Sequence, residues 1–151
     1  MRKPVDPVQT VYLGGGTPSL LSRDNLEKLF TCIYDIYGHE EGEEKTAHGN
    51  KPFKEITIEC NPDDVTDDLA HELASLGVDR VSIGAQTFSS RQLKFIRRRH
   101  TAAQIPLAVD CLHNRGIQNI SIDLMFGFPG ETLADWEDDL RKTLALQVEH
   151  I

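Results

Sequence analysis

The chain has 151 residues, of which 39% are hydrophobic, and this size and composition predict one domain, 1–151, around a single core. Acidic residues outnumber basic ones by 24 to 16, and the formal net charge of -8 argues against non-specific binding to nucleic acid or to an anionic membrane. No apolar run approaches the roughly 20 residues of a membrane span, and Met1–Thr10 lack a signal-peptide core. We therefore expect a cytoplasmic protein.

The three cysteines, Cys32, Cys60 and Cys111, are far apart in the sequence. None of their spacings is typical of a disulfide framework or of a zinc site. We expect each cysteine to be a small buried apolar residue, and we predict no metal site.

The first predicted strand, Val11–Leu13, is followed directly by the three glycines Gly14–Gly16 and then by Thr17 and Pro18. Glycine permits positive φ angles and lets a ligand approach backbone N–H groups without a Cβ in the way. Two interpretations follow for this loop. It is either a tight turn that only requires glycine or a cradle for a ligand.

A helix capped by Ser22 is expected next, followed by a polar, acidic surface loop at 38–52. The segment Glu55–Cys60 alternates like a strand and ends at Asn61-Pro62. Thr66 begins the helix that follows.

The same strand and helix pattern then repeats. Val78–Gln86 and Asn119–Phe126 are predicted strands, and Val148–Ile151 begins another. Capping boxes predict three helices, which begin at Ser89 with Gln92, at Thr101 with Gln104 and at Thr132 with Asp135. In the last helix, Trp136, Leu140, Leu144 and Leu146 form the predicted inner face.

This alternation predicts an α/β protein with a parallel sheet, whose strands are apolar enough to be covered on both faces. Either a doubly wound sheet or part of a β/α barrel fits the pattern.

Polar residues recur where the predicted strands end: Thr17, Glu59, Asn61, Gln86 and Asp123. Ligands bind at the carboxyl ends of parallel strands, so we expect these residues to face one ligand. A buried carboxylate such as Asp123 requires a partner, expected among Arg97, Arg98 and Arg99. The alternative is an internal Arg–Asp pair that only orders the core. His100 is expected to be an exposed histidine at a helix end.

Several chemistries lack their motifs. The glycine loop has no Lys-Ser/Thr of a Walker A loop, and no G-x-G-x-x-G is present. No G-x-S-x-G elbow appears, so serine hydrolysis has no visible nucleophile.

Five blocks of the sequence, in order, resemble one family. They read YLGGGTPSLL, ITIECNPDD, GVDRVSIGAQTF with RRRH, NISIDLMFGFPGETLADW and VEHI. The chain resembles the radical S-adenosylmethionine (SAM) enzymes of the oxygen-independent coproporphyrinogen III oxidase family, and in particular its haem-chaperone-like members. The resemblance implies a partial parallel (β/α) barrel, incomplete at both ends, that holds S-adenosylmethionine across the carboxyl ends of its strands.

By this resemblance, Gly15, Gly16 and Thr17 contact the amino and carboxylate end of the methionine, with Glu59 beside them. Gln86, Arg98 and Asp123 complete the cofactor-binding pocket. Backbone N–H groups and a guanidinium suit a carboxylate, and an acid suits an ammonium or sulfonium charge.

The family carries a 4Fe-4S cluster on a CxxxCxxC loop upstream of the glycine loop, and this sequence has no such cysteines. We therefore expect a central piece of a radical SAM protein of tetrapyrrole metabolism, either a coproporphyrinogen III oxidase or a haem chaperone, that is inactive alone. The alternative is a non-catalytic carrier or scaffold module that binds S-adenosylmethionine or haem. Open strand edges predict self-association.

Overall fold

The computed structural model describes residues 8–38 and 52–151 and contains a sheet of four parallel strands. The strands lie side by side in the order of the chain: β1 (Thr10–Leu13), β2 (Glu55–Cys60), β3 (Arg80–Gln86) and β4 (Asn119–Leu124). The predicted α/β class and parallel sheet are confirmed.

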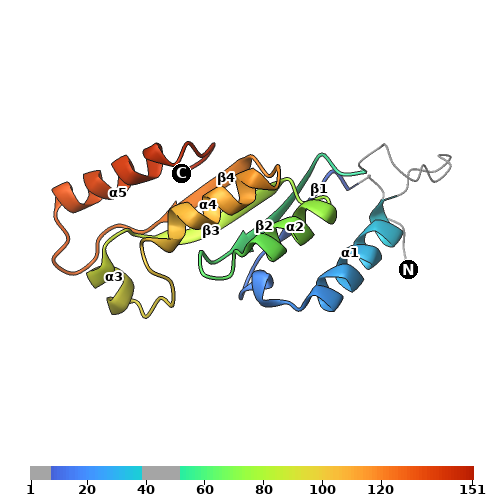
Figure 1. Cartoon of the computed structure of the whole chain (residues 1–151), viewed down its shortest axis with the longest axis horizontal. Coiled ribbons are helices and arrows are strands. Elements are labelled where there is room, and N and C mark those ends of the chain that lie inside the picture. Colours follow the sequence, from blue (N-terminus) through green and yellow to red (C-terminus); the bar gives the residue numbers. More distant parts are fainter. Residues whose placement is uncertain (1–7, 39–51) are drawn as a thin grey trace.

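Helices connect the strands, and α1, α2 and α4 lie on the same face of the sheet (Figure 1). The helical elements are a 3-10 turn η1 (Pro18–Leu20), α1 (Arg23–Tyr37), α2 (Asp67–Ser75), α3 (Ser90–Phe95), α4 (Gln104–Asn114) and α5 (Leu133–Ala145). The predicted loop at 38–52 lies outside the described residues, except for its two ends.

The two faces of the sheet differ in polarity, which corrects the expectation of strands that are apolar on both faces. Ile58, Val81 and Ile120 are neighbours in register and are fully buried. One residue further along each strand, Glu59 pairs in register with Ser82, and Ser82 pairs with Ser121. Successive residues of a strand point to opposite faces, so one face is apolar and the other is polar.

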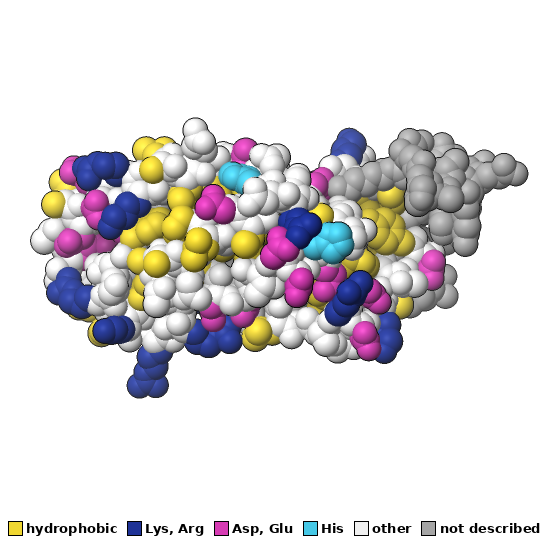
Figure 2. All heavy atoms as spheres, viewed as in Figure 1, with side chains coloured by type: hydrophobic (Ala, Val, Ile, Leu, Met, Phe, Trp, Pro, Cys, Tyr) yellow, Lys and Arg dark blue, Asp and Glu magenta, His cyan; other side chains and the backbone are white. Residues whose placement is uncertain are grey.

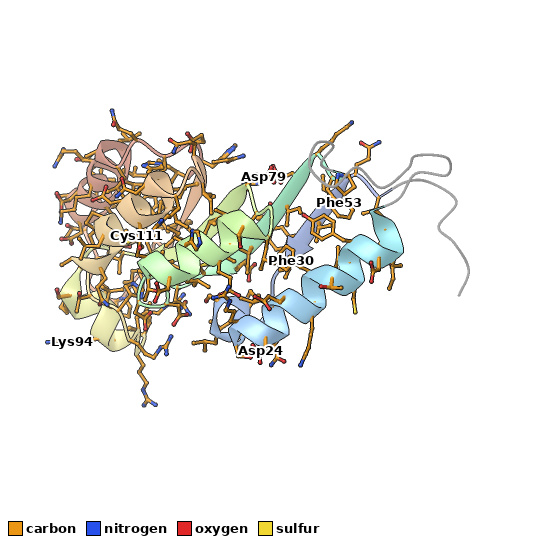
Figure 3. The ribbon with its side chains drawn as sticks, turned by 45° about the vertical axis from the view of Figure 1, so that its right-hand side comes forward. Asp24, Phe30, Phe53, Asp79, Lys94 and Cys111 are labelled. Atoms are coloured by element: carbon orange, nitrogen blue, oxygen red, sulfur yellow. The ribbon has the colours of Figure 1, made fainter. Side chains whose placement is uncertain are left out.

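An aromatic cluster fixes α1 against the sheet. Phe30 and Phe53, labelled in Figure 3, lie on either side of Tyr34, whose ring centroid is 6.4 Å from that of Phe30 and 5.6 Å from that of Phe53. The Tyr34 hydroxyl donates to the carbonyl of Leu76 at 2.9 Å, so the polar end of this ring is satisfied.

Three of the predicted helix starts are confirmed. The Thr66 side chain accepts the N–H of Leu69, the Ser89 side chain accepts the N–H of Gln92, and Thr132 forms a reciprocal capping box with Asp135. Ser22 is at the predicted N-cap of α1 but makes no side-chain capping bond.

Thr101 is not the N-cap of α4, which is Ala103. The Gln104 side chain bonds back to the N–H of Thr101, and the residues between them form a turn before the helix begins.

The last helix turns most of the predicted face inward, since Trp136, Leu140 and Leu146 are half-buried. Its fully buried residues, however, are Asp139 and Thr143, and Leu144 is 69% exposed. The reason is a polar contact, because the Asp139 carboxylate accepts the N–H of Phe88 at 2.9 Å. Figure 2 shows apolar side chains exposed near α4 and α5, among charged ones.

The segment after α5 begins to pair with β4, as predicted for a further strand. Ser121 and His150 form a parallel bridge, and the N–H of Ile122 donates to the carbonyl of His150 at 3.1 Å. The outer edge of β4 is therefore partly covered by this segment.

Candidate functional site

A pocket of about 190 Å³ opens at the carboxyl ends of the strands. It is lined by Gly16, Thr17, Pro18, Glu59, Cys60, Asn61, Ser82, Gly84, Gln86, Arg98 and Asp123. The structure thus brings six of the seven predicted site residues to one pocket. The seventh, Gly15, does not line it but donates its N–H to a carboxylate oxygen of Glu59.

The glycine loop needs glycine for two different physical reasons. Gly15 and Gly16 have φ angles of 81° and 69°, a region that other residues rarely adopt. At Gly14 a Cβ would lie 2.4 Å from the Tyr12 ring and 2.9 Å from Glu59 Oε1. The loop is therefore both a left-handed turn and a close approach to Glu59.

Glu59 is held in place from two sides. Its Oε1 accepts the Tyr12 hydroxyl at 2.8 Å, and its Oε2 accepts the N–H of Gly15 at 3.0 Å. The hydrogen bond to Glu59 and the negative charge around it raise the pKa of Tyr12, so this hydroxyl stays a donor. The sequence alone gave no signal for this role of Tyr12.

Asp123 differs from expectation in both burial and partner. Its side chain is exposed, and the Ser82 hydroxyl lies 2.9 and 3.0 Å from its two carboxylate oxygens. Within the described residues no arginine forms an ion pair with it. Asp123 therefore has no burial cost to offset, and it lines the pocket as an exposed carboxylate.

Gln86 and Arg98 also line the pocket. Gln86 has a φ angle of 67° beside an irregularity in the pairing of β3 with β4, a strained conformation typical of functional sites. Arg98 Nη1 donates to Asn61 Oδ1 at 3.0 Å. A Cβ on Gly84 would lie 2.9 Å from Gln86 Nε2 and 3.3 Å from Arg98 Nη2, so glycine leaves room for both side chains.

His100 corrects a further expectation, because it is buried rather than exposed at a helix end. Only 3% of it is accessible, and its Nε2 lies 3.1 Å from the carbonyl oxygen of Ala85. Burial lowers the pKa of this imidazole. The contact joins residues that are fifteen positions apart, which no local sequence pattern indicates.

The cysteines are also less uniform than predicted, since Cys60 is buried, Cys32 is exposed and Cys111 is half-buried. Burial raises the pKa of the Cys60 thiol to about 12, which keeps it protonated and unsuited to binding a metal. In the described ranges no group of three or more His, Cys, Asp or Glu residues is placed to hold a metal ion. In the same ranges, no helix is long and apolar enough to cross a membrane.

The arrangement combines two carboxylates, one guanidinium and the N–H groups of a glycine loop around a small pocket. Such a site can bind a small molecule that carries both a positive and a negative charge.

Comparison with known proteins identifies the family. The model of the radical SAM superfamily matches residues 1–143. The chain is 38% identical over 147 residues to the heme chaperone HemW of Lactococcus lactis. This alignment covers 97% of this chain and 36% of that protein. It is 32% identical over 145 residues to an oxygen-independent coproporphyrinogen III oxidase of Synechocystis, over 96% of this chain and 29% of that protein.

Among solved structures, coproporphyrinogen III oxidase HemN from Escherichia coli, a radical SAM enzyme, matches with a TM-score of 0.78. The match has 23% identity and covers 94% of this chain and 30% of that one. This likeness confirms the predicted fold, that of the radical SAM β/α barrel. The chain spans about a third of the length of the curated relatives that it matches.

Proposed function

The chain belongs to the radical SAM superfamily, and on that premise we propose that its strand-end pocket binds S-adenosylmethionine. The observation that carries the proposal is that Gly16, Thr17, Glu59 and three further predicted residues, Gln86, Arg98 and Asp123, line one pocket. They come from β2, β3 and β4, from the loop after β1 and, for Arg98, from the segment between α3 and α4. Sequence motifs far apart in the chain therefore converge on a single site.

The donor set fits the charges of this ligand. Its methionine end carries an ammonium and a carboxylate, and its sulfonium carries a further positive charge. We assign the N–H groups of Gly15 and Gly16, with Thr17, to the carboxylate, and Glu59 to the ammonium. Gln86, Arg98 and Asp123 complete the pocket around the rest of the molecule. When bound, S-adenosylmethionine supplies the chemistry of the family; this chain's residues bind and orient it.

The residues present do not fit a 4Fe-4S cluster, which in this family supports the chemistry of S-adenosylmethionine. The sequence has only three cysteines, far apart, and the Cys60 thiol is buried and protonated. We therefore expect that the chain as given does not cleave S-adenosylmethionine reductively. Formation of 5′-deoxyadenosine after iron-sulfur reconstitution and dithionite treatment would overturn this expectation.

Calorimetric titration with S-adenosylmethionine tests the pocket. We expect the double variant Glu59→Gln, Asp123→Asn to bind at least about tenfold more weakly than the wild type, because a hydrogen bond to a charged group contributes about 1.5–3 kcal/mol. The matched control is Asp110→Asn, Glu137→Gln, which removes two exposed acids outside the pocket lining. Equal binding by the wild type and the pocket variant would show that these acids are not part of the site.

For the whole protein we propose a role in tetrapyrrole metabolism in the cytoplasm, since the matched relatives are named as heme chaperones and coproporphyrinogen III oxidases. Titration with haem, followed by absorbance, distinguishes a heme chaperone from a coproporphyrinogen III oxidase. Saturable haem binding supports the chaperone role, and its absence supports the oxidase role.

A second candidate is a non-catalytic carrier or scaffold. It rests on the strand-end pocket alone, whose charged residues can bind a ligand without further chemistry. Its signature would be tight binding of S-adenosylmethionine or haem with no turnover.

We also propose that the chain is one domain and self-associates through its sheet. Within the described residues, β1 is at one end of the sheet, with an outer edge that no strand pairs with. Such edges recruit strands of other chains. A single monomer peak in size-exclusion chromatography over a wide concentration range would contradict self-association.

A further inference from the structure

A second cavity, of about 350 Å³, adjoins the strand-end pocket. Its lining residues are Thr17, Leu20, Asn61, Asp63, Arg97, Arg98, Arg99 and His100. Thr17, Asn61 and Arg98 line both cavities, so the two spaces share a wall. The proposed binding of S-adenosylmethionine does not use the remaining residues of this second cavity.

The three arginines of the cavity differ in how their charges are balanced. Arg99 forms ion pairs with Asp63 at 3.1 Å and with Asp64 at 2.7 Å. Arg98 donates to the neutral side chain of Asn61, and in the part of the chain that the structure describes no carboxylate is within ion-pair distance of Arg97 or Arg98. Arg97 and Arg98, which both line the cavity, therefore have no carboxylate partner among the described residues.

This local excess of positive charge contrasts with the rest of the protein, whose formal net charge is -8. Guanidinium groups bind carboxylates and phosphates through paired hydrogen bonds. Thr17, which carries a hydroxyl donor, and the apolar residue Leu20 also line the cavity.

Arg97 has a backbone conformation that would suit glycine better. It follows the C-cap of α3 with a φ angle of 56°, and the N–H of Arg98 returns to the carbonyl of Leu93 at 2.9 Å, as in a helix end closed by glycine. A side chain at this position carries a conformational cost of order 1 kcal/mol. Arg97 is therefore a position that glycine can occupy without loss of the helix end.

We propose that this second cavity is an anion-binding subsite for the carboxylate or phosphate group of a small organic molecule. Arg97 binds the anionic group, Arg98 lies on the wall that this cavity shares with the strand-end pocket, and Leu20 contacts the apolar part. That the occupant lies beside S-adenosylmethionine rests on the proposed function, whereas anion binding by the cavity does not.

The test is a titration of the isotopically labelled chain with inorganic phosphate and, separately, with succinate, at constant ionic strength, followed by NMR. We expect saturable shifts of the amides of Thr17 and of residues 97–100 with at least one of the two anions. Phosphate binding alone assigns the subsite to phosphates, and succinate binding alone assigns it to carboxylates. The absence of saturable shifts with both anions would overturn the proposal.

The variant Arg97→Gly removes the guanidinium and suits the φ angle of 56°, so it keeps the fold. We expect it to weaken anion binding at least fivefold. The control Arg141→Gln removes an exposed arginine of α5 and should bind as the wild type does. Equal weakening in both variants, or none in Arg97→Gly, would overturn the subsite.

Measuring the affinity for S-adenosylmethionine tests the anion-binding subsite separately from the proposed S-adenosylmethionine pocket. Arg97→Gly should bind that ligand within twofold of the wild type, because Arg97 does not line the strand-end pocket. Loss of anion binding in Arg97→Gly with intact binding of S-adenosylmethionine supports the subsite. A chain that binds anions but not S-adenosylmethionine contradicts only the proposed function.

Discussion

The two faces of the sheet are built from the same four strands and have opposite roles. Ile58 is fully buried on the apolar face, and the next residue, Glu59, lines the strand-end pocket. Likewise Val81 is fully buried in the core and Ser82 holds Asp123. Neighbouring residues of one strand therefore belong to the core and to the proposed binding site in turn. Single substitutions can change the stability of the fold or the affinity for a ligand separately.

The largest effect is expected from the apolar face. Ile58→Ala should lower the free energy of unfolding by about 2–5 kcal/mol, because it deletes buried side-chain volume from the core. The matched substitution on the polar face, Ser82→Ala, removes one hydroxyl that donates to Asp123 and should cost about 1.5 kcal/mol or less. Urea denaturation of both variants measures the difference, and an equal loss would mean that the two faces are not distinct.

A smaller effect is expected from pH. Burial holds the pKa of His100 below its ordinary value of 6.5, so the unfolded chain binds a proton more readily than the folded one. The free energy of unfolding should therefore fall as the pH is lowered below about 6.5, through the folded pKa.

His100→Gln should flatten this part of the stability profile relative to the wild type. The matched control, His71→Gln, alters an exposed histidine of α2. If the wild type and His100→Gln have parallel profiles, His100 does not contribute to the pH dependence.

The smallest effect is expected at Tyr12, on the polar face. Tyr12→Phe removes the hydroxyl that donates to Glu59 and leaves the ring over Gly14. We expect S-adenosylmethionine to bind about two- to tenfold more weakly, which corresponds to the loss of one hydrogen bond of about 0.5–1.5 kcal/mol. Tyr37→Phe, on the exposed end of α1, is the control. A Tyr12→Phe variant with unchanged affinity would show that this hydroxyl does not position Glu59.

Local patterns predicted most of the fold. The strand Glu55–Cys60 has the predicted bounds because its alternation and the following Asn-Pro are local signals. The capping box of Thr132 is equally local and is confirmed. At Thr101 the same pattern was misleading, since the Gln104 side chain bonds to a turn that precedes the helix.

The positions of the site residues were predictable, because parallel strands bring their carboxyl ends together. Their partners were not. Asp123 is held by Ser82, which depends on the register between β3 and β4, and His100 is buried by a contact with Ala85. The role of Tyr12 depends on the close approach of Gly14 to Glu59. These contacts join residues that are distant in the sequence.

The N–H of Gly15 donates to the carboxylate of Glu59, so a side chain of the protein occupies the donor that we assign to the ligand carboxylate. In the proposed binding mode the carboxylate of the incoming molecule takes over that N–H, and Glu59 is released with its charge. A ligand that carries only a carboxylate would then face an unpaired acid, whereas one that also carries an ammonium would neutralise it. On the proposed binding mode, the exchange at Gly15 would therefore favour amino acids over simple acids.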